Sequence, residues 1–313
     1  MSASQREVFG ATLVELAETY DDFILLDGDL ANSTRADLLF EAHPERFIEL
    51  GIAEQNLAGV AAGLASVGFR PWLSSFTVFL VHRDLDQVRM TIAQTHLPVR
   101  LAGAYSGLFT GLTGKSHQCF EDLAIMRSLV GMSVLCPADG EEARRLMHYA
   151  HTVDGPVYLR LCRDPAGDLS SPPTEDEDPT RARWLRRGRD LTFVSTGTQT
   201  LRTLRAAEEL LAETGIDAGV LHLPSLVPVD RAAVLEAASQ GPIVTTEEHS
   251  TTGGLGSLVS EIVAEACPVR VHRIGIEGRF GASGSNDDLL EGYGLSASRV
   301  ARRAAAFHAT LAH

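Results

Sequence analysis

The sequence contains no long hydrophobic run and no concentration of positive charge. No stretch approaches the ~18 apolar residues that a membrane span needs, and the opening segment MSASQREVFG lacks the apolar run of a signal peptide. The formal net charge of −14 argues against a nucleic-acid partner, because phosphate backbones bind clustered Lys and Arg. These absences predict a cytoplasmic protein whose partners include neither a membrane nor a nucleic acid.

Cysteine is also scarce. Cys119, Cys136, Cys162 and Cys267 lie far apart in the sequence, and none belongs to a C-x-x-C pair. This spacing argues against a disulfide framework or a zinc site and favours reduced thiols.

Apolar strands alternate with helices along both halves of the chain. In the first half we predict strands at 23–26, 47–49, 70–74, 99–103, 133–136 and 157–161, and helices at 5–20, 54–68, 77–94, 121–129 and 139–152. In the second half we predict strands at 191–196, 218–223, 242–248 and 269–275, helices at 199–213, 230–239 and 255–266, and two short helices at the end. Strands that are apolar throughout and are separated by helices indicate an α/β fold with mostly parallel sheets flanked by helices.

A polar segment separates the two halves. Residues 170–180 (SSPPTEDEDPT) hold three prolines and four acidic side chains, so they cannot bury much apolar surface. We therefore predict two domains, residues 1–168 and 184–313, joined by a linker at 169–183. The alternative is a long surface loop within one domain.

One acidic residue stands where ligands bind in open α/β sheets. Glu54 lies in GIAEQNLAG, directly after a predicted strand and at the start of a predicted helix. The crevice at the carboxyl ends of parallel strands is the usual ligand site of such folds. A carboxylate in the first helical turn also offsets the helix dipole, so Glu54 is either a structural residue or one that shares a proton with a ligand.

Two further segments contain candidate residues. The loop 103–118 is rich in glycine and includes His117, but it matches neither the Walker motif nor G-x-G-x-x-G, and no G-x-S-x-G motif signals a catalytic triad. Phe76, Phe79 and His82 follow one another at three-residue spacing, which places them roughly along one helix face. Such a stripe is either core packing or a wall on which a flat heterocycle stacks.

The order of several motifs resembles one known family. RFIELGIAEQNLAGVAAGLA, SSFTVF with DQVR, GKSHQCFEDLAIMR, VLCPAD and GPVYLRL follow one another as in the pyrimidine-binding domain of transketolase. VTTEEHSTTGGLGS and RFGASGS resemble the transketolase C-terminal domain. The resemblance extends from about residue 5 to 310.

The resemblance implies a split enzyme that depends on thiamine diphosphate and Mg²⁺. A full transketolase also has a diphosphate-binding domain with a G-D-G motif, and in DGDLANS the second glycine is replaced by Leu30. We therefore predict no metal site in this chain. A separate subunit is expected to hold the metal and the diphosphate, and the assembly is expected to be an α2β2 heterotetramer.

The resemblance also assigns roles to individual residues. Glu54 falls at the family's catalytic glutamate, which activates the aminopyrimidine ring of the cofactor, and burial is expected to favour its protonated form. His117, in Ser116-His117-Gln118, falls at a catalytic histidine that faces the substrate. The predicted cofactor contacts are Asp29, Glu54, Phe76 and Phe79, together with His82 from the aromatic stripe. The predicted substrate-phosphate contacts are Arg6, Ser33 and Arg163.

Two positions depart from the family, and they leave the substrate open. Tyr105 stands where a histidine is usual, and Thr113 stands where an aspartate is usual. We therefore predict transfer of a two-carbon ketol unit from a ketose or ketose phosphate to an aldehyde, with an unusual donor or acceptor. The alternatives are a β-type subunit of a 2-oxo acid decarboxylase or dehydrogenase, a carboligase like deoxyxylulose-phosphate synthase, and a noncatalytic partner subunit.

Overall fold

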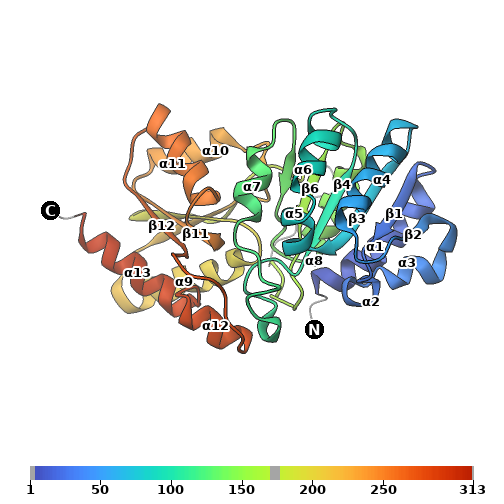
Figure 1. The fold of residues 1–313 in the computed structure, drawn as a ribbon. Helices are drawn as coiled ribbons and strands as arrows, with labels where there is room; N and C mark the ends of the chain where they lie inside the picture. The colour runs from blue at the N-terminus through green and yellow to red at the C-terminus, as the bar shows by residue number, and fades with distance from the viewer. Residues whose placement is uncertain (1–3, 170–176, 312–313) are drawn as a thin grey trace.

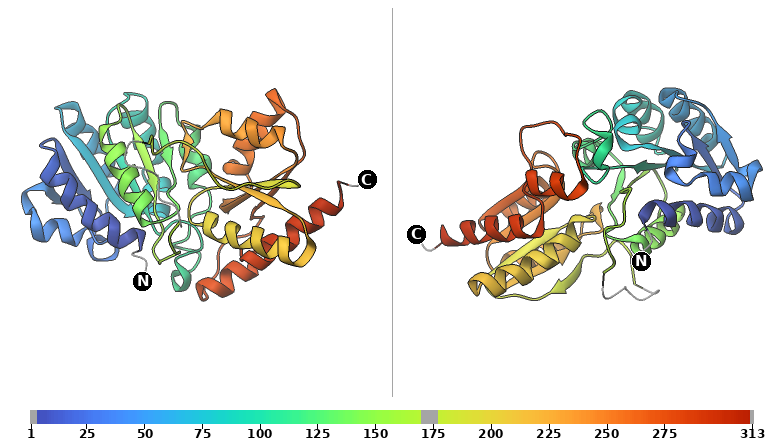
Figure 2. Two further views of the ribbon diagram at one scale, coloured as in Figure 1. Left: turned by 180° about the vertical axis from the view of Figure 1, so that it is seen from behind. Right: turned by 90° about the horizontal axis from the view of Figure 1, so that it is seen from below.

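The computed structural model describes residues 4–169 and 177–311. They form two sheets that lie next to one another along the long axis of the molecule, and helices cover both faces of each (Figure 1). Two further views show the same two-part arrangement (Figure 2). The predicted α/β fold with two mostly parallel sheets is confirmed.

The first sheet has seven strands within the described residues. Their order across the sheet is β10-β5-β6-β4-β3-β1-β2, and every pair is parallel except β10 with β5. The bounds are β1 (Phe23–Asp27), β2 (Phe47–Glu49), β3 (Arg70–Phe76), β4 (Arg100–Ala104), β5 (Ser133–Leu135), β6 (Val157–Arg160) and β10 (Ser225–Val227).

Helices pack on both faces of this sheet. One face carries α1 (Gln5–Thr19), α2 (Ala31–Thr34), α3 (Asp37–Ala42) and α8 (Gly140–Thr152), and the other carries α4 (Glu54–Ser66), α5 (Thr77–His82), α6 (Leu85–Gln87), η2 (Val88–Ala93) and α7 (Asp122–Ser128). The short turns η1 (Pro44–Arg46) and η3 (Gly111–Thr113) lie in loops. Alternate residues of β1 serve the two cores: Phe23 and Leu25 pack with α1, whereas Ile24 and Leu26 pack with α4. This double burial explains why the strand is apolar throughout.

The predicted single helix at 77–94 is wrong. The structure divides this segment into α5, α6 and the π-helix η2, with a break at Arg83 and Asp84. Arg83 turns toward Glu54, and the side chain of Asp84 is fully buried. Contacts with distant residues therefore interrupt a segment whose local periodicity is helical.

The second sheet has the order β12-β11-β8-β9-β7 in the described part of the chain, and only β7 runs antiparallel to its neighbour. The bounds are β7 (Arg183–Arg186), β8 (Leu191–Ser195), β9 (Ala218–His222), β11 (Ile243–Ser250) and β12 (Val271–Ile276). The helices α9 (Gln199–Thr214) and α13 (Ala297–Ala309) pack on one face, α10 (Arg231–Ser239) and α11 (Leu255–Ala266) pack on the other, and α12 (Asn286–Gly292) precedes α13. Of the two closing helices, α13 is longer than predicted, and β7 and β10 were not predicted.

The two halves are interlocked. Strand β10 belongs to the second half of the sequence but pairs with β5 of the first sheet. One hydrophobic core also continues from α4 and α7 to α10 and α11. Residues 170–176, the centre of the predicted linker, lie outside the described residues, so the predicted domain limits stay a prediction.

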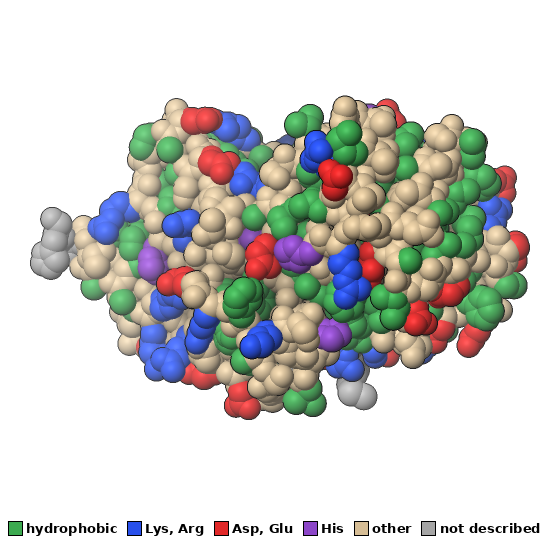
Figure 3. Space-filling view, viewed as in Figure 1, with side chains coloured by type: hydrophobic (Ala, Val, Ile, Leu, Met, Phe, Trp, Pro, Cys, Tyr) green, Lys and Arg blue, Asp and Glu red, His purple; other side chains and the backbone are tan. Residues whose placement is uncertain are grey.

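Lys and Arg side chains gather over the region of α12 and α13 despite the acidic net charge (Figure 3). Among the helices of the described residues, none is both long and apolar enough to span a bilayer.

Candidate functional site

Glu54 is the first residue of α4, and its side chain is buried with 4% exposure. The Arg83 guanidinium donates a hydrogen bond to Glu54 Oε1 at 2.8 Å. The same guanidinium lies over the Phe79 ring, 4.0 Å from its centre. A flat nitrogen-containing group is thus held between a buried carboxylate and an aromatic face.

A second buried acid lies beside Glu54. Among the described residues, neither carboxyl oxygen of Asp84 has a hydrogen-bond partner outside its own backbone. Burial raises the pKa of Asp84 to about 8, and the nearby charge of Glu54 contributes to this rise. Asp84 is therefore a neutral carboxylic acid near pH 7.

Phe76 and Phe79 of the predicted stripe lie in one aromatic wall, although Phe76 ends β3 and does not belong to the helix. Phe76 stacks on Tyr105 with ring centres 4.0 Å apart, and Phe79 stacks on Phe76 at 5.9 Å. His117 meets Phe79 edge-on at 5.3 Å and Phe76 at 6.0 Å, while its Nδ1 lies 2.9 Å from Ser116 Oγ. Tyr105 thus extends the wall at the position where the family has histidine.

His82 ends α5, and its ring is directed toward Cys119 and Glu121. Its Nε2 lies 3.7 Å from both the Cys119 sulfur and Glu121 Oε2. The Glu121 carboxylate raises the pKa of His82 above its usual value.

Arg6, Ser33 and Arg163, the predicted contacts of the substrate phosphate, lie close together. The carbonyl oxygen of Ser33 accepts hydrogen bonds from the Tyr105 hydroxyl at 3.2 Å and from Arg6 at 3.5 Å. Arg163 Nε donates to the Tyr105 hydroxyl at 3.1 Å, and its other end pairs with Asp164 at 2.7 Å. Two cations therefore lie within one hydrogen-bond network, and Tyr105 is its centre.

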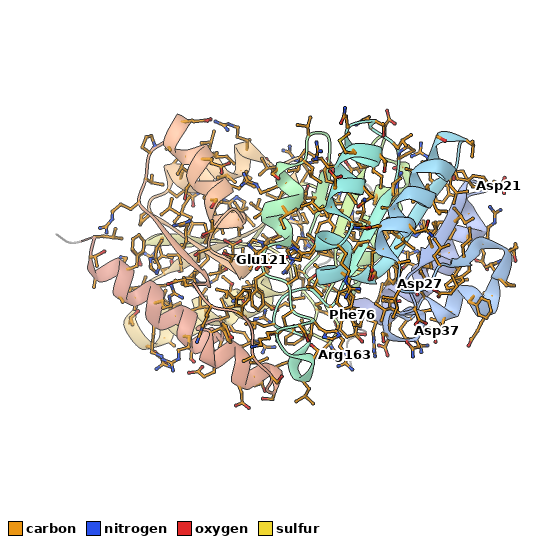
Figure 4. All side chains as sticks on the ribbon, viewed as in Figure 1. Asp21, Asp27, Asp37, Phe76, Glu121 and Arg163 are labelled. Carbon is orange, nitrogen blue, oxygen red and sulfur yellow. The ribbon has the colours of Figure 1, made fainter. Side chains whose placement is uncertain are left out.

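A cavity of about 470 Å³ connects the aromatic wall with this cationic network. Its lining includes Ser33, Phe76, Tyr105, His117 and Arg163, and the second half of the chain adds Ser285 and Asn286. Figure 4 places Phe76 and Arg163 near one another beside the loop that follows β4. The cavity therefore combines an apolar wall with positive charge and exchangeable protons.

Asp29 and Asp27 occupy different environments. Asp29 is exposed and adopts a left-handed backbone conformation with φ of 65°, and its amide donates to Glu49 Oε1 at 3.0 Å. Asp27 is fully buried, its Oδ1 accepts from the Leu30 amide at 2.7 Å, and burial raises its pKa to about 6. Asp27 is the buried acid at the end of β1, and the predicted cofactor contact of Asp29 stays a prediction.

The second half of the chain holds the glycine-rich loop in place. Glu248 Oε1 accepts hydrogen bonds from the amides of Leu108 and Phe109 at 2.7 and 2.8 Å, and its other oxygen binds Arg202. Gly107 has a φ of 71°, and a Cβ there would meet Glu248 Oε1 at 2.4 Å. Only glycine permits this approach.

Sequence reasoning missed four residues of the site: Arg83, Asp84, Asp164 and Asn286. Arg83 and Asp84 were assigned to the interior of a helix, and nothing in the local sequence marks the break after His82. Asp164 follows the predicted Arg163, and Asn286 follows the recognised segment RFGASGS and donates a hydrogen bond to Asp164 at 2.7 Å. Asp164 and Asn286 could have been predicted because each directly follows a residue or motif that the sequence already marks.

Comparisons with known proteins match nearly the whole chain. The family model for the transketolase pyrimidine binding domain matches residues 1–167, and the model for the transketolase C-terminal domain matches residues 180–300. The chain is 39% identical over 302 residues to the 6-deoxy-6-sulfo-D-fructose transketolase subunit SqwH of Clostridium sp. strain MSTE9, covering 96% of this chain and 92% of that protein. It is 33% identical to one subunit of the apulose-4-phosphate transketolase of Phocaeicola vulgatus, covering 96% of each.

A solved structure also matches this chain in fold and sequence. A split-gene transketolase, described as an inactive beta4 tetramer, superposes with a TM-score of 0.86 at 40% identity and covers 96% of this chain and 97% of that chain. The family models, the relatives and the fold agree along the chain. This protein therefore belongs to the transketolase family, as a separate subunit made of the pyrimidine-binding and C-terminal domains.

Proposed function

We propose that this chain is the pyrimidine-binding subunit of a two-component transketolase that transfers a two-carbon ketol unit to an aldehyde acceptor. The observation that carries the proposal is the arrangement of Glu54 and Phe79 about the Arg83 guanidinium. A guanidinium resembles an aminopyrimidine in being flat and in donating N–H groups. The two side chains fit the aminopyrimidine of thiamine diphosphate in the same way.

The residues fit only one end of that cofactor. Glu54 and the rings of Phe76 and Phe79 suit the aminopyrimidine, and the network of Arg6 and Arg163 suits the anionic end of a sugar. Leu30 takes the place of the second glycine of a G-D-G motif. Mg²⁺ and the diphosphate are therefore assigned to the partner subunit.

Each residue has a definite task in this scheme. When bound, thiamine diphosphate supplies the carbon nucleophile for ketol transfer. Glu54 shares a proton with N1′ of the aminopyrimidine, and its burial excludes water from that proton. His117 lines the cavity and exchanges protons with substrate hydroxyls, and Asp29 is an additional cofactor contact. Arg6, Arg163 and Ser33 hold the anionic group of the sugar.

The relatives support both the partner and the class of substrate. Two of them are named as subunits of enzymes for a sulfonated sugar and for a sugar phosphate, and a third is described as an inactive tetramer of β chains. We propose an α2β2 assembly here and a sugar with an anionic terminal group. The four cysteines are all free among the described residues, which supports a cytoplasmic location.

Reconstitution tests the proposal. The chain alone should be inactive, and mixing it with a diphosphate-binding subunit, thiamine diphosphate and Mg²⁺ should give ketol transfer between a ketose phosphate and an aldehyde without release of CO₂. A matched mixture without the partner subunit is the control. Release of CO₂ from pyruvate, with no ketol transfer, would show that the chain serves a 2-oxo acid enzyme instead.

A further inference from the structure

Three potential metal ligands from the first half of the chain lie close to one another. His82 ends α5, Cys119 lies in the loop after the glycine-rich segment, and Glu121 immediately precedes α7. The distances between the three ligand atoms are 3.7 Å for Nε2 to Sγ, 3.8 Å for Sγ to Oε2 and 3.7 Å for Nε2 to Oε2. The atoms thus form a nearly equilateral triangle.

Although the sequence alone predicts no metal site in this chain, we propose that His82, Cys119 and Glu121 bind a divalent cation of the Zn²⁺ class. Zinc accepts imidazole nitrogen, thiolate sulfur and carboxylate oxygen at about 2.0–2.3 Å in tetrahedral geometry, which places ligand atoms about 3.3–3.6 Å apart. The observed triangle needs to contract by only a few tenths of an ångström. The three ligand atoms lie within 3.8 Å of one another, so they surround a shared point.

Backbone contacts hold two of the ligands in place. The amide of Phe120 donates a hydrogen bond to Glu121 Oε2 at 3.0 Å. The amide of Gly107 donates to the carbonyl oxygen of Cys119 at 3.1 Å. Such outer contacts fix the orientation of metal ligands and strengthen binding.

The charges of the three groups also suit a dication. Thiolate and carboxylate together neutralise a charge of +2, and His82 binds as neutral imidazole. Because the thiolate is the form that binds a metal, binding releases the thiol proton of Cys119 to solvent.

Solvent can reach this site. The side chains of His82 and Glu121 are 42% and 46% exposed, whereas Cys119 is fully buried at the base. Glu121 also lines a cavity of about 250 Å³ together with Arg279 and Phe280. Histidine and acidic side chains lie next to one another on the surface in Figure 3, in the region where Figure 4 labels Glu121. The fourth coordination position is therefore open to water, as in zinc sites that are not purely structural.

Co²⁺ is the probe that tests the site, because thiolate ligation to Co²⁺ gives an intense near-ultraviolet charge-transfer band. Titration of the full chain, without cofactor or partner subunit, should give this band at one Co²⁺ per chain, and Zn²⁺ should abolish it by competition. Cys119→Ser should lose the band. Glu121→Gln and His82→Gln should each weaken Zn²⁺ binding at least about tenfold, since even outer-sphere changes have effects of that size.

Cys267→Ser is the matched control, because Cys267 is the most exposed of the four thiols. A band that persists in Cys119→Ser, or one that disappears in Cys267→Ser, would overturn the proposal, as would the absence of a band in the unaltered chain. Circular dichroism shows whether Cys119→Ser folds. If it does not fold, the test rests on the variants at the partly exposed residues His82 and Glu121. Unchanged Zn²⁺ affinity in both Glu121→Gln and His82→Gln then rejects the site. None of these outcomes depends on the proposed transketolase activity.

Discussion

The Arg83 guanidinium lies 2.8 Å from Glu54 Oε1 and 4.0 Å from the centre of the Phe79 ring, and it therefore occupies both contacts assigned to the cofactor's aminopyrimidine. An aminopyrimidine that uses these contacts must displace Arg83. Arg83 is half exposed, and breaking its ion pair costs about 1 kcal/mol, which corresponds to about a fivefold change in affinity.

Arg83→Ala should therefore bind thiamine diphosphate several-fold more tightly in the assembled enzyme. Calorimetric titration measures this affinity. Arg89→Ala removes an exposed pair with Asp86 nearby and should change nothing. Weaker binding by Arg83→Ala would mean that Arg83 helps to hold the cofactor.

Glu54→Gln should lower kcat of the reconstituted enzyme at least about 100-fold, because the amide cannot share a proton with the aminopyrimidine as the acid does. Steady-state ketol transfer measures the effect, and size-exclusion chromatography should show unchanged assembly. The exposed Glu45→Gln is the control. Activity close to that of the unaltered enzyme in Glu54→Gln would reject the proposed role.

Asp84→Asn should stabilise the protein at alkaline pH. The carboxyl group keeps its proton in the folded chain up to about pH 8, whereas its ordinary pKa is 3.8, so the folded state binds more protons between these values. Stability must therefore fall as pH rises through this range, and the neutral amide removes that loss.

Near pH 4, Asp84→Asn and the unaltered chain should have the same Tm. Above pH 8, Asp84→Asn should have the higher Tm, and its free energy of unfolding should be larger by at least about 1 kcal/mol. Differential scanning fluorimetry across this range measures the difference. The exposed Asp86→Asn should show no such pH dependence. A constant difference at all pH values would count against a buried neutral acid.

Tyr105→Phe should weaken the binding of a sugar phosphate in the cavity. The hydroxyl joins Ser33 to Arg163, and loss of one such hydrogen bond costs about 1 kcal/mol. We expect KM for a phosphorylated ketose to rise about fivefold with little change in kcat, as initial-rate kinetics would measure. Tyr293→Phe removes a comparable bond to the Phe280 carbonyl outside the cavity and should leave KM unchanged.

Glu248→Ala should destabilise the fold and release the glycine-rich loop. The substitution leaves Arg202 and the amides of Leu108 and Phe109 without their buried acceptor, at a cost of about 3–5 kcal/mol. Thermal unfolding and hydrogen exchange of the loop amides measure both effects. Glu236→Ala breaks the exposed pair with Arg187 and should cost less than about 1 kcal/mol. Similar costs for the two variants would contradict this role of Glu248.

Local sequence patterns predicted most of the elements. Strands β1, β3 and β4 appeared as apolar runs because they are buried on both faces, and α4 and α9 appeared as the helices between such runs. Motif order also identified the family, and it named Phe76, His117, Ser33 and Arg163, which line one cavity. The catalytic and binding roles of these residues stay predictions.

The amino-acid sequence by itself determined the alternation of strands and helices, the family, and the set of side chains available for chemistry, because each depends on neighbouring residues or on motif order. Only the tertiary structure decided the break after His82, the insertion of β10 into the first sheet, the contact of Glu248 with the loop and the meeting of His82 with Cys119. Each of these joins residues far apart in the sequence, and the burial and close approach that fix them exist only once the chain is folded.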